Sequence, residues 1–80
     1  MSKNPHGESF RILLHNITWL RAHYGYSKAR MAEILKVGIS TINQIEAGVI
    51  PPRLSTEILF RIHRHFGIHP ADLISQRLPY

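Results

Sequence analysis

The sequence predicts an all-α fold of five helices. Apolar residues recur at the helical period of about 3.6 in separate segments, and glycine or proline residues divide these segments. The strict alternation of apolar and polar residues that indicates a strand is not found in the sequence. Because the chain has 80 residues and 44% of them are hydrophobic, one globular domain is expected.

The first helix is predicted over residues 9–24, after a loose arm at residues 1–8. The arm contains Asn4-Pro5 and Gly7, which disfavour regular structure. Gly25 is expected to close the helix. One apolar stripe follows it at helical spacing: Phe10, Leu13, Leu14, Ile17, Leu20 and Tyr24.

Two short helices joined by a tight turn are predicted next. Ser27 can cap the first of them, because its hydroxyl can accept a hydrogen bond from a free backbone N–H. Gly38 is expected to supply the turn, where a residue free of Cβ crowding is needed. The second short helix covers residues 39–47, turns Ile42 and Ile45 inward, and ends at Gly48.

Two further helices complete the domain, which we expect to span residues 9–75. Pro51 and Pro52 prevent the preceding helix from continuing. A fourth helix begins near Ser55, ends at Gly67 and buries an apolar face: Ile58, Leu59, Ile62 and Phe66. His69-Pro70 opens a last short helix, and residues 76–80 form a C-terminal tail.

Residues 27–48 resemble the helix-turn-helix of lambda-repressor-like proteins, also called Cro/C1-type or XRE-type. The family pattern has an Ala in the second helix and Ile-x-x-Ile-Glu-x-Gly in the third, and it is matched by Ala32, Ile42, Ile45, Glu46 and Gly48. Flanking matches are Leu20-Arg21, Tyr24-Gly25, Leu59, Ile62, Phe66-Gly67-Ile68 and Leu73. The resemblance covers about residues 10–75 and implies a compact five-helix DNA-binding domain.

The third helix of this family lies in the major groove, and the resemblance assigns base contact to Ile39, Ser40, Asn43 and Gln44. Asn43 and Gln44 carry amides that can pair with the N6/N7 edge of adenine. Ile39 departs from the family, which usually has a polar residue there. It can contact a thymine methyl group but cannot hydrogen-bond, and the alternative is that it is packed and makes no DNA contact. The alternative is that these polar residues form a solvated helix face without a ligand.

Phosphate contact is expected from residues that flank this helix: Lys28, Arg30, Thr41, Arg53, Ser55 and Thr56. Lys36 is a further candidate. Lys28 stands where the family most often has a Gln that contacts a phosphate and braces the reading helix. A lysine can still meet a phosphate, but it offers no acceptor to a neighbouring side chain. The alternative is that these cations simply face water.

Glu46 lies in the last turn of the third helix, at the negative end of the helix dipole, and therefore needs a cationic partner. In the family an arginine of the first helix pairs with this glutamate, and Arg21 matches that position. We expect the Arg21–Glu46 pair to maintain the fold and not to contact DNA.

A second stripe on the first helix includes Ile12 and Trp19, which lie away from the predicted core face. Together with Leu78 and Tyr80 of the tail they are candidates for a dimer or partner surface. The alternative is that Trp19 folds onto the arm or tail of its own chain. An interaction module, such as an antitoxin or adaptor, is the second functional hypothesis.

The net charge of +5, from ten basic and five acidic residues, suits an anionic partner, although residues 39–47 contain no Lys or Arg. No cysteine is present, and His63, His65 and His69 have poor spacing for a metal, so neither a metal nor a cofactor is expected. The scattered carboxylates do not predict an enzyme. No signal peptide or membrane-spanning run occurs, which makes the cytoplasm the expected location.

The sequence therefore predicts a transcriptional repressor that binds duplex DNA sequence-specifically. Family members commonly bind as dimers, so we expect a homodimer on an inverted-repeat operator.

Overall fold

A computed structural model describes residues 5–52 and 54–79. Helices, and no strand, are found in this described part. They are α1 (Pro5–Tyr24), α2 (Lys28–Leu35), α3 (Ile39–Glu46), α4 (Glu57–Phe66) and α5 (Pro70–Leu73). The predicted all-α fold of five helices is confirmed.

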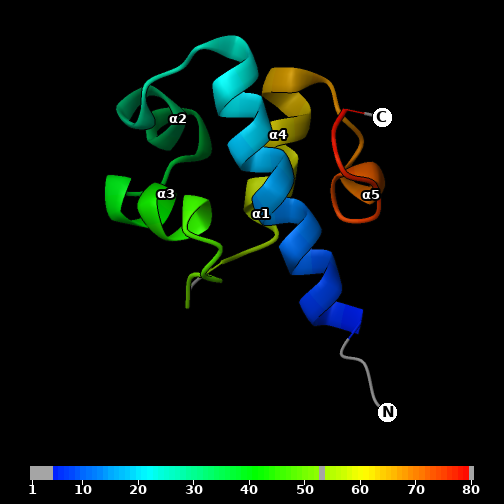
Figure 1. The fold of residues 1–80 in the computed structure, drawn as a ribbon. Helices are drawn as coiled ribbons and strands as arrows, with labels where there is room; N and C mark the ends of the chain where they lie inside the picture. The colour runs from blue at the N-terminus through cyan, green and yellow to red at the C-terminus, as the bar shows by residue number, and fades with distance from the viewer. Residues whose placement is uncertain (1–4, 53, 80) are drawn as a thin grey trace.

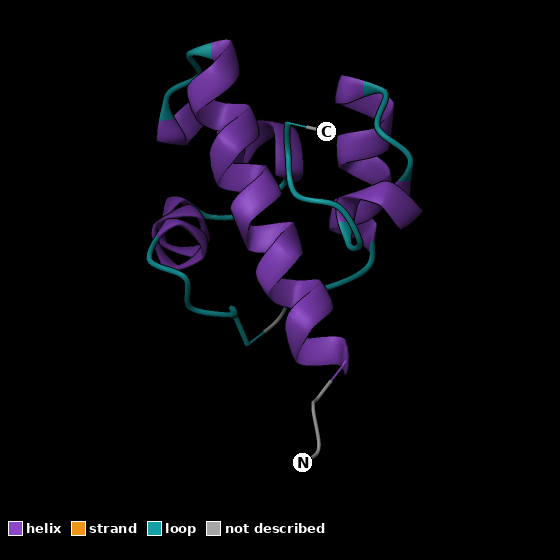
Figure 2. Cartoon of the chain, turned by 45° about the vertical axis from the view of Figure 1, so that its right-hand side comes forward, coloured by secondary structure: helices purple, strands orange, loops and turns teal. Residues whose placement is uncertain are grey.

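The long helix α1 crosses the middle of the molecule, with α2 and α3 on one side of it and α5 on the other (Figure 1). It packs against both α3 and α5, while α2 contacts α3 and α4. Figure 2 shows the same arrangement turned, with the C-terminal segment lying along α1. No helix among the described residues is long and apolar enough to cross a membrane.

Helix α1 begins at Pro5 and not at Ser9, so the prediction of a loose arm is wrong for residues 5–8. Proline is tolerated in the first turn because the N–H that it lacks has no partner there. Residues 1–4 of the predicted arm lie outside the described residues.

The turn between α2 and α3 differs from the prediction in the residue that has the left-handed conformation. Ser27 caps α2 as expected, since its Oγ accepts from the Arg30 N–H at 3.0 Å. The left-handed residue, however, is Lys36 with φ 60°, and its N–H bonds the carbonyls of Ala32 and Glu33. Gly38 has φ −79° and precedes α3 in extended backbone. Lys36 therefore closes α2, and the prediction for Gly38 is wrong.

One apolar core joins the helices, and its least exposed members are Leu13, Leu14, Ile17, Leu20, Met31, Ala32, Leu35, Ile42, Ile45, Ile58, Ile62, Leu73 and Leu78. The predicted stripe of α1 is correct at its centre and wrong at its ends. Phe10 is 36% exposed and Tyr24 is 50% exposed. In α4, Leu59 and Phe66 are half-buried at the border of the core.

The C-terminal tail is held against α1 by Asn16, a fully buried polar residue that sequence reasoning missed. Its Nδ2 donates to the carbonyls of Leu73 and Gln76, both at 2.8 Å. Its Oδ1 accepts from the Leu78 N–H at 2.7 Å. One side chain therefore satisfies three backbone groups, and the described tail residues 76–79 belong to the packed domain.

We predict that Asn16→Ala lowers the free energy of unfolding by about 3 kcal/mol, because it leaves buried backbone groups without partners. His15→Ala is the matched control, since exposed His15 makes one contact with the same segment, from Nε2 to the Leu78 carbonyl at 2.9 Å. Urea unfolding measures both, and amide exchange at Leu78 should accelerate in Asn16→Ala. Equal stability of the two variants would contradict the conclusion that Asn16 holds the C-terminal tail against α1.

Candidate nucleic-acid interface

The outer face of α3 is polar, uncharged and exposed. The inner face is anchored in the core by Ile42 and Ile45, which are 0% and 1% exposed. Ser40, Asn43 and Gln44 lie on the opposite side and are exposed, as predicted. Buried isoleucines on one side and amides on the other fix the direction in which the polar side chains point.

Two other α3 positions and the residue that caps the helix differ in their surroundings. Ile39 is 48% exposed, at the start of the helix. Thr41 is half-buried and borders a hollow between α3 and the segment that contains Pro51. Ala47 was missed by sequence reasoning: it is exposed, and it lies one turn beyond Asn43 and Gln44 on the same face. The helical period alone could have identified it.

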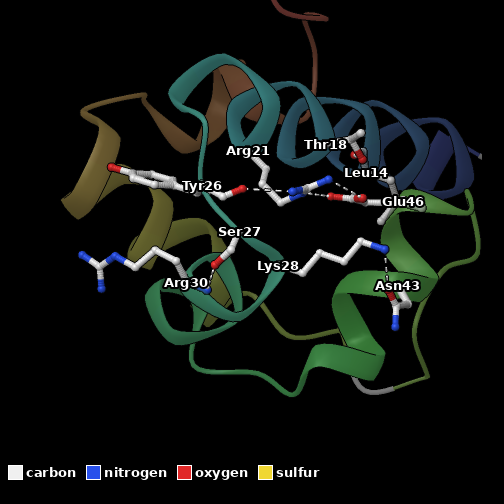
Figure 3. A network of polar contacts seen from close by, with 9 residues as sticks. All are labelled: Leu14, Thr18, Arg21, Tyr26, Ser27, Lys28, Arg30, Asn43 and Glu46. Carbon is white, nitrogen blue, oxygen red and sulfur yellow. Dashed lines mark hydrogen bonds and ion pairs between the residues drawn. The ribbon is translucent and has the colours of Figure 1, made fainter.

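Arg21 and Glu46 form the predicted ion pair between α1 and the last turn of α3 (Figure 3). The contact is two-pronged: Arg21 Nε donates to Glu46 Oε2, and Nη2 donates to Oε1 at 3.0 Å. Arg21 Nη1 also donates to the Tyr26 carbonyl at 2.9 Å. Hydrogen bonding to the Glu46 carboxylate, which accepts from Arg21, raises the pKa of the Arg21 guanidinium.

This ion pair has an electrostatic consequence for the surface. Arg21 and Glu46 have only 25% and 15% of their side chains exposed. Because the arginine neutralises the carboxylate, α3 carries no unpaired acidic group that would repel phosphates.

Lys28 and Asn43 contact each other across the α2–α3 turn. Lys28 Nζ donates to Asn43 Oδ1 at 2.8 Å, and both residues are exposed (Figure 3). Lys28 thus braces the outer face of α3 as a donor. A lysine offers no acceptor to a neighbouring side chain, and this contact was not predicted from the sequence. The two remaining N–H groups of the ammonium are available to a phosphate.

Arg30 lies away from this surface. Its Nη1 donates to Glu33 Oε1 at 2.8 Å, and its guanidinium lies 5.9 Å from the centre of the Tyr26 ring. Figure 3 places the Arg30 guanidinium on the side of α2 opposite Asn43. The expected phosphate contact of Arg30 therefore does not fit this geometry. Lys36 is exposed at the end of α2.

The N-terminus of α4 carries the next predicted phosphate contacts. Ser55 and Thr56 are exposed, and the Thr56 side chain makes no capping hydrogen bond. Its hydroxyl can therefore donate to a ligand. Arg53, the charged member of this predicted group, lies outside the described residues.

The predicted dimer or partner surface is wrong at two of its four residues. Ile12 and Leu78 are each only 8% exposed. Trp19 is half-buried, packs against the core and stacks on His23 of the same helix with ring centres 4.4 Å apart. Tyr80 lies outside the described residues. The buried face of α1 is wider than the predicted apolar stripe, because the C-terminal tail covers a second face of the helix beside the core face.

The histidines near α5 take part in local contacts. His63 Nδ1 lies 3.1 Å from the Ile68 carbonyl oxygen, and the His63 and His69 ring centres are 6.2 Å apart. His69 Nδ1 accepts from the Ala71 N–H and so caps α5. Within the described residues, no group of three or more His, Asp or Glu side chains has the geometry of a metal site.

Two helices joined by a tight turn, with a polar outer face on the second, define a helix-turn-helix domain. A family model described as helix-turn-helix matches residues 17–73. The chain belongs to this family, the Cro/C1-type or XRE group, whose members are regulators that bind double-stranded DNA. No curated protein and no solved structure gave a match in the same comparisons.

We predict that Glu46→Ala lowers the free energy of unfolding by about 2 kcal/mol, between the values for exposed and fully buried ion pairs. The control Glu33→Ala breaks the exposed Arg30–Glu33 pair and should cost less than about 0.5 kcal/mol. Chemical unfolding of both variants tests this difference. If Glu46→Ala were no less stable than Glu33→Ala, the ion pair would not hold α3 in place.

Proposed function

We propose that this protein is a transcriptional repressor that reads a specific duplex sequence by placing α3 in the major groove. The exposed amide face of α3 carries this proposal, because Asn43 and Gln44 can each donate and accept hydrogen bonds at base edges. Ser40 and Ile39 lie at the N-terminal end of the helix and would contact neighbouring bases. Ala47 can meet a thymine methyl group.

Contacts to the phosphate backbone would set the register of α3. Lys28 lies beside α3, while Ser55 and Thr56 stand at the N-terminus of α4. Thr41 and Arg53 remain further predictions for the same role. The net charge of +5 supports association with DNA, and the absence of Lys and Arg from α3 leaves this helix for base recognition.

We further propose that the protein binds as a homodimer on an inverted repeat. Two copies related by a twofold axis would place their α3 helices in successive major grooves, about 10–10.5 base pairs apart. Occupation of such an operator would block polymerase and repress transcription. Since Ile12 and Leu78 are buried, the dimer contact must use other residues.

Selection from a randomised duplex library tests this function directly. We predict enrichment of an inverted repeat, with affinity that falls steeply as the salt concentration rises. Retention without enrichment would leave only nonspecific attraction by the basic charge. No retention at low salt would contradict DNA binding by this chain.

The DNA affinities of two matched variants test whether α3 reads the selected sequence. Gln44→Ala should weaken the selected site by about 1–3 kcal/mol and leave nonspecific DNA binding nearly unchanged. Gln76→Ala makes the same chemical change at an exposed position beyond α5 and should affect neither. An equal loss on all sequences in Gln44→Ala would contradict base reading.

A further inference from the structure

The Lys28–Asn43 contact determines which hydrogen-bonding groups α3 can present. An asparagine amide has an oxygen that accepts and a nitrogen that donates, and rotation by half a turn exchanges them. A lysine ammonium has only donors. The amide must therefore turn its oxygen to Lys28, as observed at 2.8 Å, and its NH₂ group away from it. Figure 3 shows the Asn43 nitrogen on the side away from Lys28.

This orientation changes the base that Asn43 can recognise. A freely rotating asparagine pairs with adenine by accepting from N6 and donating to N7. Here one of the two lone pairs of the oxygen already accepts from an ammonium group. The adenine N6 amino group, itself a donor, would have to bind the same oxygen beside that positive charge, which is electrostatically unfavourable. Guanine instead presents two acceptors, N7 and O6, in the major groove. Both are attracted by the Asn43 NH₂ group and by the nearby positive charge.

We propose that Lys28 is a positioning residue that makes Asn43 a guanine reader, in place of the adenine contact expected from the sequence. This inference rests on the proposed function, because it requires α3 to lie in the major groove. Lys28 keeps two N–H groups for a neighbouring phosphate, so positioning and anchoring are compatible.

Gln44 provides an internal contrast. Among the described residues, no side-chain hydrogen bond holds its amide, so it can rotate to match adenine. The two neighbouring amides of α3 would therefore have different base preferences, although their side chains carry the same chemical group. The difference arises from the ammonium of α2 and not from α3 itself.

Library selection with variants at both positions tests this inference. Asn43→Ala identifies the base pair that Asn43 reads, since preference should be lost at that position alone. In the unaltered protein this position should be guanine. Lys28→Met keeps the length of the side chain but removes its donors, and we expect the guanine-over-adenine preference there to fall about tenfold. Lys28→Arg restores a donor-only partner and should restore guanine.

The outcomes separate the inference from the proposed function. Adenine at the Asn43 position, or guanine preference unchanged in Lys28→Met, would overturn the inference alone. A uniform loss on all sequences in Lys28→Met, with the guanine-over-adenine ratio unchanged, would do the same, because it would show a phosphate contact only. Absence of any enriched sequence for the unaltered protein would overturn both. Thermal unfolding should be the same for all four proteins, since Lys28 and Asn43 are exposed.

Discussion

The position of α3 depends on one charged contact, the bidentate ion pair between Arg21 and Glu46. Arg21 stands near the end of α1, donates two hydrogen bonds to the Glu46 carboxylate of α3, and donates a third to the carbonyl of Tyr26 between α1 and α2. A single guanidinium thus joins three parts of the chain. Its planar group of donors permits this, because separate N–H groups point to the carboxylate and to the carbonyl. The same contact neutralises the negative charge of Glu46 beside the polar face of α3.

Two other polar contacts have separate roles in the structure. Lys28 orients Asn43 on the exposed side of the helix-turn-helix, whereas Asn16 binds the C-terminal tail inside the protein. The exposed contact has water as a competitor and contributes little to stability, so its consequence is the direction of an amide. The buried contact has no such competitor and satisfies backbone groups that would otherwise be unpaired. The proposed recognition and the stability of the fold therefore rest on different residues, which can be varied separately.

Much of the fold followed from local signals in the sequence. The cap at Ser27, the helix end at Gly48 and the inward isoleucines of α3 depend on neighbouring residues and were predicted correctly. The pairing of Arg21 with Glu46 followed from the family pattern. Lys36 as the left-handed residue was not predicted, because a glycine two positions later offered a stronger local signal.

The missed features depend on residues far apart in the sequence. The partners of Asn16 are backbone atoms 57 to 62 positions away, and no periodic pattern reveals them. Burial of Ile12 and Leu78 has the same origin, and the orientation of Asn43 depends on how α2 crosses α3.

The most direct test of the whole account is an NMR titration of ¹⁵N-labelled protein with the selected duplex. The side-chain NH₂ signals of Asn43 and Gln44 should shift strongly while that of Gln76 stays in place. Shifts confined to Trp19 and His23, with the α3 amides unchanged, would contradict recognition by α3.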